Sequence, residues 1–191
     1  ESNLTLREGE GGNTGSAYHQ WEVSVWKDES PEKKNVYAYD LARLKPGDIL
    51  KFDDFGFEAA VKLYFANAEA FVGRDKNTAE VKNASGIHEL SEVEKQAEPE
   101  KNFPGVIFEL RQPGKTAANI LLFGKENQPI QIELNGQRLN FQVRRKRFPL
   151  PTMLTLKKFE MEQHPGTEVA RSYKSYVTVD HQGVKRDAEI Y

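Results

Sequence analysis

The stretch "PIQIELNGQRLNFQV", residues 129–143, decides the fold class of this chain. Its Asn135-Gly136 pair is typical of a two-residue type I′ hairpin turn, in which both central residues take positive φ. A turn at this point sets the facing pairs Ile130–Phe141, Ile132–Leu139, Glu133–Arg138 and Leu134–Gln137. The apolar pairs share one face, and Glu133 meets Arg138 as an opposite-charge pair on the other. We therefore predict a hairpin with Ile130, Ile132, Leu139 and Phe141 buried together.

Similar alternation of apolar and polar residues recurs on both sides of this hairpin. The segments are 20–26, 36–44, 49–57, 58–72, 105–112, 118–124, 152–162, 172–179 and 184–191. They predict about nine to twelve strands and at most one or two short helices. The expected fold is mainly β, as an antiparallel β-sandwich or a distorted barrel.

Composition suggests how the chain is divided. Residues 1–16 are Gly-rich and polar, which predicts a flexible lead-in before a β domain at 17–191. Residues 73–102 are highly charged, which predicts an insertion in the β domain. In an alternative division, this insertion joins two β subdomains. Within the insertion, Ile87, Leu90 and Val93 could form a short amphipathic helix, and an extended surface segment is the alternative.

The overall charge and residue usage exclude several classes of protein. Of 191 residues, 27 are basic and 29 acidic, so neither a nucleic-acid footprint nor an acidic tail is indicated. The absence of cysteine excludes disulfides, thiolate metal sites and cysteine catalysis. No apolar run is long enough for a transmembrane helix, so we expect any export or anchoring segments to lie outside this sequence.

Catalytic and metal-binding motifs are incomplete. The "PGKT" at 113–116 has Glu109 where a phosphate-binding loop needs glycine, and "HELSE" at 88–92 has Glu92 where a zinc motif needs histidine. No Gly-x-Ser-x-Gly elbow is present. Asp53 and Asp54 fit solvated turn acids better than a catalytic pair. We predict no catalytic residue.

Four histidines are scattered through the chain, at His19, His88, His164 and His181. Such spacing is more typical of surface residues than of ligands, so we also predict no metal site. A basic run, "RRKR" at 144–147, has two interpretations. It could be an anion patch or nuclear signal, or a solvated strand end.

The C-terminal half carries a resemblance to a known family. The motif residues are Leu150-Pro151, Leu154, Leu156, Phe159, His164-Pro165-Gly166-Thr167, Ser175 and Val177. This Leu-x-Leu-x-x-Phe strand, Pro-Gly-Thr turn and Ser-x-Val strand resemble the extracytoplasmic domain of ResB-like cytochrome c biogenesis proteins. The specific part spans residues 139–179, and "LTLREGE" at 4–10 is similar to the family's entry into the domain.

The resemblance implies a function for the chain. It would be an extracytoplasmic domain of a membrane protein, anchored by helices absent from this sequence, that assists covalent attachment of haem to apocytochrome c. Its partners would be apocytochrome c and a CcsA-type haem-handling membrane protein. The chain alone would act as a non-catalytic docking or scaffold module of the haem lyase complex and bind no cofactor itself, with haem handled by the full complex.

The residues themselves leave a second hypothesis open. A free-standing β-sandwich that binds carbohydrate or another small ligand would use aromatic side chains, and Trp21 and Trp26 are candidates if they are exposed. The His164-Pro165-Gly166-Thr167 turn is expected to be architectural. We predict a type II turn with Gly166 at positive φ and Thr167 returning the chain to strand.

Overall fold

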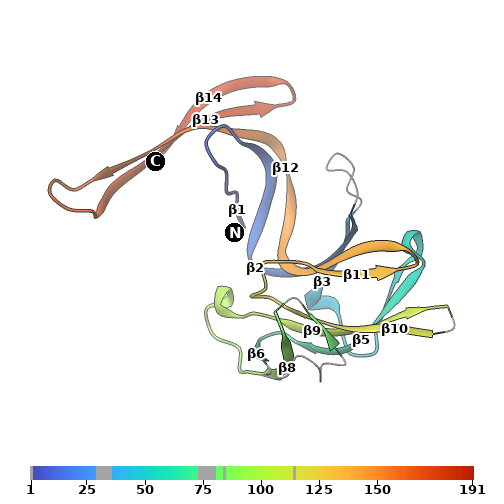
Figure 1. Ribbon diagram of the computed structural model, residues 1–191. Helices are drawn as coiled ribbons and strands as arrows, with labels where there is room; N and C mark the ends of the chain where they lie inside the picture. Colours follow the sequence, from blue (N-terminus) through green and yellow to red (C-terminus); the bar gives the residue numbers. More distant parts are fainter. Residues whose placement is uncertain (1, 29–35, 73–80, 84, 114) are drawn as a thin grey trace. The chain divides into compact units, whose positions relative to one another are not determined.

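The computed structural model describes residues 2–28, 36–72, 81–83, 85–113 and 115–191. The strands are β1 (Ser2–Asn3), β2 (Gly11–Lys27), β3 (Val36–Asp40), β4 (Ile49–Phe52), β5 (Phe57–Phe65), β6 (Ala68–Val72), β7 (Val81–Lys82), β8 (Ile87–Glu92), β9 (Gly105–Gln112), β10 (Lys115–Phe123), β11 (Ile130–Leu134), β12 (Gln137–Gln163), β13 (Ala170–His181) and β14 (Val184–Ile190) (Figure 1). The described residues also form three 3-10 helices, η1 (Leu41–Arg43), η2 (Asp53–Phe55) and η3 (Pro99–Lys101). The mainly β prediction is therefore confirmed.

The chain divides into two compact units, each described separately. Unit 1 combines Glu1–Ala17 with Arg147–Tyr191, and unit 2 is the continuous segment Tyr18–Lys146. The divisions fall inside β2 and β12, so both strands contribute residues to each unit. The insertion at 73–102, considered as a joint between subdomains, lies inside unit 2.

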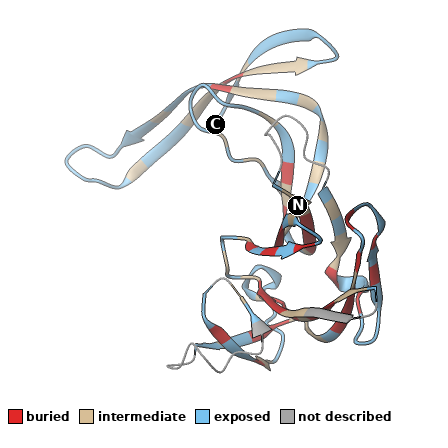
Figure 2. Cartoon of the chain, turned by 45° about the vertical axis from the view of Figure 1, so that its right-hand side comes forward, coloured by how far each residue is buried: buried red, intermediate tan, exposed pale blue. Residues whose placement is uncertain are grey.

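Unit 2 is sandwich-like. One sheet has the order β4-β5-β9-β10-β7, and the facing layer is formed by β3, β2, β12 and β11. The main core contains residues of both layers, including Val25 and Phe141 from one and Phe52 and Phe108 from the other. The sheets are not closed, so the sandwich alternative holds and the barrel alternative does not. Figure 2 shows buried stretches along the strands of this unit.

The hairpin around Asn135-Gly136 has the predicted register. Ile130 pairs with Phe141, Ile132 with Leu139 and Glu133 with Arg138. The four apolar residues are buried, whereas Glu133 and Arg138 are exposed. Asn135 and Gly136 have φ of 52° and 70°, as a type I′ turn requires.

The insertion forms strand at Ile87 and Leu90, where the sequence pattern allowed a short amphipathic helix, and it ends in η3. Ile87 and Leu90 belong to β8, which pairs with β6. Both are buried in a second small cluster with Phe123 from β10. The extended alternative holds because these apolar residues pack against a neighbouring sheet. The pattern of residues 87–93 alone does not reveal that sheet. Residues 73–80 and 84 lie outside the described residues.

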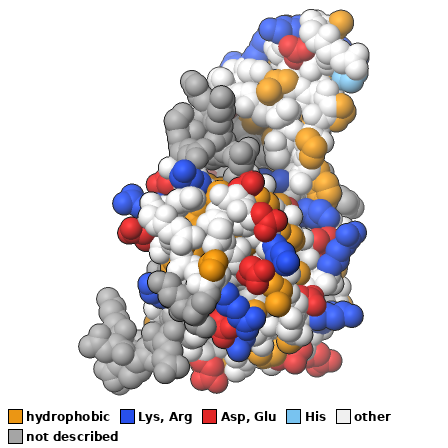
Figure 3. Space-filling view, turned by 90° about the vertical axis from the view of Figure 1, so that its right-hand side faces the viewer, with side chains coloured by type: hydrophobic (Ala, Val, Ile, Leu, Met, Phe, Trp, Pro, Cys, Tyr) orange, Lys and Arg blue, Asp and Glu red, His pale blue; other side chains and the backbone are white. Residues whose placement is uncertain are grey.

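Unit 1 is built around the C-terminal part of β12 with β13 and β14. The expected lead-in at 1–16 contributes strand structure here, because Ser2 and Asn3 of β1 pair with Ala17 and Ser16 of β2. Neither buried hydrophobic cluster of the described chain includes a unit 1 residue. A single sheet layer without a core of its own leaves apolar side chains on its surface, some of which are visible in Figure 3.

Candidate functional site

An apolar groove of about 790 Å³ runs over one face of the unit 1 sheet. Its apolar lining residues are Leu4, Leu6, Leu154, Leu156, Phe159, Val177 and Ile190. Its polar ones are Thr5, Arg7, Glu8 and Ser175. The groove contains five residues of the family-like motif, namely Leu154, Leu156, Phe159, Ser175 and Val177. It is the candidate functional site of the chain.

A β-bulge explains the spacing of this motif. Leu156 pairs with Val177 and Lys158 with Tyr176, so Lys157 is an extra residue in β12. Because side chains alternate between faces, an extra residue shifts the alternation by one. Phe159, which pairs with Ser175, thereby lies on the same face as Leu156. The Leu-x-Leu-x-x-Phe pattern is thus an alternating apolar face interrupted once by a bulge.

The N-terminal segment satisfies the backbone beside the bulge. The Phe159 amide donates to Glu8 Oε1 at 2.6 Å. Gly9 N donates to Leu156 O at 2.7 Å, and Leu156 N donates to Glu10 O at 3.0 Å. Residues 8–10 therefore hold the strand at the point where its ladder is irregular, and residues 4–8 line the groove beside them.

The opposite face of the same sheet is charged and internally paired. Lys157 Nζ lies 2.8 Å from Asp187 Oδ1, and Lys174 Nζ lies 2.7 Å from Glu189 Oε2. The hydrogen bond from Lys174 lowers the pKa of Glu189, and the Glu189 carboxylate raises the pKa of Lys174. The sheet is therefore two-sided, with water-compatible ion pairs on one face and an apolar groove on the other.

Unit 2 holds a smaller pocket of about 370 Å³, which is a second place for a ligand. Trp21, Asp40, Tyr64 and Asn102 contribute to its wall. Burial, together with the charge of Asp40, raises the pKa of Tyr64. The hydrogen bond from Lys146 at 2.8 Å lowers the pKa of Asp40. The pocket thus offers one hydroxyl donor and one carboxylate.

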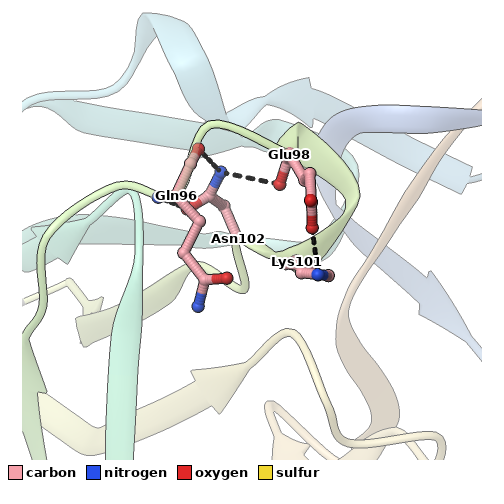
Figure 4. Close-up of polar contacts among 4 residues, drawn as sticks. All are labelled: Gln96, Glu98, Lys101 and Asn102. Atoms are coloured by element: carbon pink, nitrogen blue, oxygen red, sulfur yellow. Dashed lines mark hydrogen bonds and ion pairs between the residues drawn. The ribbon is translucent and has the colours of Figure 1, made fainter.

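A loop clamp shapes one side of that pocket. Asn102 Nδ2 donates to the carbonyl oxygens of Gln96 and Glu98 at 3.1 and 3.4 Å, and Gln96 N donates back to Asn102 Oδ1 at 2.8 Å (Figure 4). Lys101 forms an ion pair with Glu98. Trp21 Nε1 donates to Asn102 O at 3.2 Å, which ties β2 to the clamped loop.

Trp21 is a packing residue. Its ring lies 5.8 Å from that of Phe103, and the Arg145 guanidinium carbon lies 3.9 Å from its centroid. The basic run 144–147 lies inside β12 and is not a strand end, and three of its four cations have partners within unit 2. Arg144 Nε lies 2.8 Å from Glu22 Oε1, Lys146 pairs with Asp40, and all four residues belong to β12. Strand formation separates these cations and gives them different partners.

No protein-family model matches this chain, and no curated protein matches it. No helix of the described chain has the length and hydropathy needed to span a membrane.

The remaining residues singled out in the sequence do not converge. Among the described residues, no group of three or more His, Asp or Glu side chains could hold a metal ion. His19 lines the unit 2 pocket and His88 is an exposed residue of β8. Asp53 and Asp54 are exposed in η2, as expected of turn acids, and Tyr37 donates a hydrogen bond to Asp54.

His164 lies in the connection between β12 and β13. Thr167 N donates to His164 O at 3.0 Å and Gly166 has φ of 78°, so the predicted type II turn is confirmed. The prediction that Thr167 returns the chain to strand is wrong, because β13 begins at Ala170. The Thr167 hydroxyl instead accepts from Val169 N, and His164 N donates to Val169 O, which closes a longer loop.

Proposed function

We propose that this chain is a docking module that uses the apolar groove of unit 1. The observation that carries the proposal is the exposure of large apolar side chains there: Phe159 is 47% and Ile190 53% exposed, although both line one groove. Contiguous apolar surface of this kind marks interaction sites in soluble domains. Seven of the groove's eleven lining residues are apolar, which suits a surface that holds a partner.

The setting of the proposal is cytochrome c maturation. It rests on the sequence resemblance of residues 139–179 to the extracytoplasmic domain of ResB-like proteins. The groove residues Leu154, Leu156 and Phe159 coincide with that motif, which supports a shared role for the motif and the surface. In this setting the partners are a CcsA-type membrane protein and apocytochrome c, on the extracytoplasmic side, with haem handled by the full complex.

The test is a surface substitution in the full-length membrane protein, assayed in cells that depend on it. Met161 lies two residues beyond Phe159 on the same face of β12. We expect Phe159→Ser with Met161→Ser to reduce covalent haem attachment to cytochrome c at least several-fold, as seen on a haem-stained gel. Both side chains are exposed, at 47% and 46%, so accumulation of the protein should be unchanged. Phe71→Ser is the matched control, since Phe71 is 44% exposed in unit 2. Unchanged haem attachment in the double variant would reject the groove as a docking surface.

Carbohydrate binding by a free-standing sandwich is less well supported. That hypothesis needs an open aromatic platform, and one face of Trp21 is covered by Arg145. Trp26 is only partly exposed as well. These contacts favour the docking proposal.

A further inference from the structure

β14 has an open hydrogen-bonding edge. In the described chain it pairs with β13 alone, and it is the last strand of its sheet. Gln182 and Gly183 form a two-residue turn with φ of 52° and 85°, so the closing pair His181–Val184 is hydrogen-bonded. Hydrogen-bonded and non-bonded pairs alternate along an antiparallel ladder.

The alternation determines which residues face outward. The backbone N–H and C=O groups point toward β13 at Val184, Arg186, Ala188 and Ile190. Lys185, Asp187 and Glu189 therefore point their N–H and C=O groups away from the sheet. These groups are the template that a further strand would need.

The side chains of β14 define what kind of strand fits. Its two acids are already neutralised, Asp187 by Lys157 and Glu189 by Lys174. Its two cations are held less closely: Lys185 forms only a long ion pair with Asp180, at 4.0 Å and with a side chain 71% exposed, and Arg186 has no ion-pair partner among the described residues. The charge left over along this edge is positive and complements an acidic segment.

The apolar face defines the rest of the segment. Ala188 pairs with Val177 and Ile190 with Ser175, so Ala188 and Ile190 continue the groove face to the edge of the sheet. A neighbouring strand would place every second side chain beside them. Valine-like residues at those positions would extend the apolar face across the open side.

We propose that β14 binds an extended peptide segment by strand addition, and that the segment is acidic opposite Lys185 and Arg186 and apolar at alternate positions opposite Ala188 and Ile190. Strand addition of this kind takes affinity from main-chain hydrogen bonds and specificity from alternate side chains. The inference rests on the proposed docking function, because it names the form of the partner that the groove face receives.

The test uses the 191-residue chain labelled with ¹⁵N and an end-blocked heptapeptide, Glu-Glu followed by alternating Thr and Val, so that Val lies opposite Ala188 and Ile190, synthesised in both directions. We expect saturable binding by one of the two peptides. Amide exchange should slow at least tenfold at Lys185, Asp187 and Glu189, with little change at Arg186 and Ala188, whose amides already bond to β13. A peptide with Lys-Lys in place of Glu-Glu should bind more weakly.

The Lys185→Glu, Arg186→Glu variant should weaken peptide binding roughly fivefold, the scale of two exposed charge pairs. Arg43→Glu with Lys45→Glu, two exposed cations of unit 2, is the matched control. Binding without exchange protection at the three outward amides, or no binding, would overturn strand addition. If the three outward amides become protected from exchange as the protein concentration rises without peptide, β14 pairs with a second copy of the chain and the peptide proposal is overturned. If strand addition fails but the Phe159→Ser, Met161→Ser variant loses haem attachment, the proposed docking function of the groove still stands.

Discussion

Arg145 stacks on Trp21 with its guanidinium carbon 3.9 Å from the ring centroid. The contact joins β12 to β2 within unit 2, and Arg145 Nη2 extends it by donating to Glu100 O at 2.8 Å. Burial lowers the pKa of Arg145, because removal from water disfavours the charged form of the guanidinium group. A cation held between an aromatic ring and a carbonyl is a structural clamp.

Removal of this clamp should destabilise the protein. We expect Arg145→Ala to lower the free energy of unfolding by about 1–3 kcal/mol, because it loses a partly desolvated cation–π contact and a charge-assisted hydrogen bond. Urea unfolding followed by tryptophan fluorescence measures the change. Arg138→Ala, at an exposed position of the same strand, should change the value by less than about 0.5 kcal/mol. Equal effects of the two substitutions would contradict the clamp.

The turn at 164–167 predicts a second stability effect. Gly166→Val should cost about 1–3 kcal/mol, because Gly166 has φ of 78° and a β-branched residue is strained there. Crowding does not contribute, since a Cβ at this position meets nothing within 4 Å. Gly166→Asn should cost less, as asparagine tolerates this region. His164→Tyr should be neutral or slightly stabilising and leave haem attachment intact. Thermal unfolding of the three variants separates backbone strain from a role for the imidazole.

Acid should weaken the contact between Asp40 and Lys146. The hydrogen bond from Lys146, aided by Ala42 N, lowers the pKa of Asp40 below its ordinary 3.8. A carboxyl whose pKa is lower in the folded state adds stability above the unfolded pKa, and this stability is lost as pH falls through the folded pKa. The stability difference between the natural protein and Asp40→Asn should therefore be full at pH 6 and shrink below about pH 3.8. Urea unfolding at several pH values tests this, with the exposed Asp28→Asn as control. A difference that does not change with pH would show that the charge of Asp40 is not involved.

Haem should not acquire two histidine ligands from unit 1. His164 hydrogen-bonds to Val169 just before β13 begins, and His181 is the last residue of that strand. Twelve strand residues separate the two imidazoles by on the order of 35 Å, far beyond the span of one iron. Titration of the chain with haem should give a broad Soret band without the sharp low-spin spectrum of paired histidines. A sharp spectrum abolished by His164→Ala would refute this.

Local features of the structure were predictable from sequence because their causes are local. The hairpin at 130–141 needed only a turn dipeptide and alternation, and its register is as predicted. Even there, one role of Asn135 was not visible. Its side-chain amide donates to Gly56 O at 3.0 Å and accepts from Gln112 at 2.6 Å, from segments far away in sequence.

The features that define the candidate groove depend on distant partners. The Leu-x-Leu-x-x-Phe spacing could have indicated a bulge, but the bond from the Phe159 amide to Glu8 joins residues 151 positions apart. The basic run at 144–147 allowed two interpretations, a patch or a solvated strand end, since nothing nearby in the sequence reveals Glu22 or Trp21 as partners. Pairing between remote strands is therefore what the sequence pattern alone could not supply.

The two-segment make-up of unit 1 has a consequence for biosynthesis. Unit 2 is continuous, so all its residues have been synthesised once Lys146 has been added. Unit 1 cannot form when residues 1–17 have been made, because it also needs β13 and β14, which are made much later. Contacts between such remote segments form slowly, because a long loop must close first. The apolar groove is thus completed after unit 2 has been synthesised, and its apolar side chains stay uncovered on the growing chain until then.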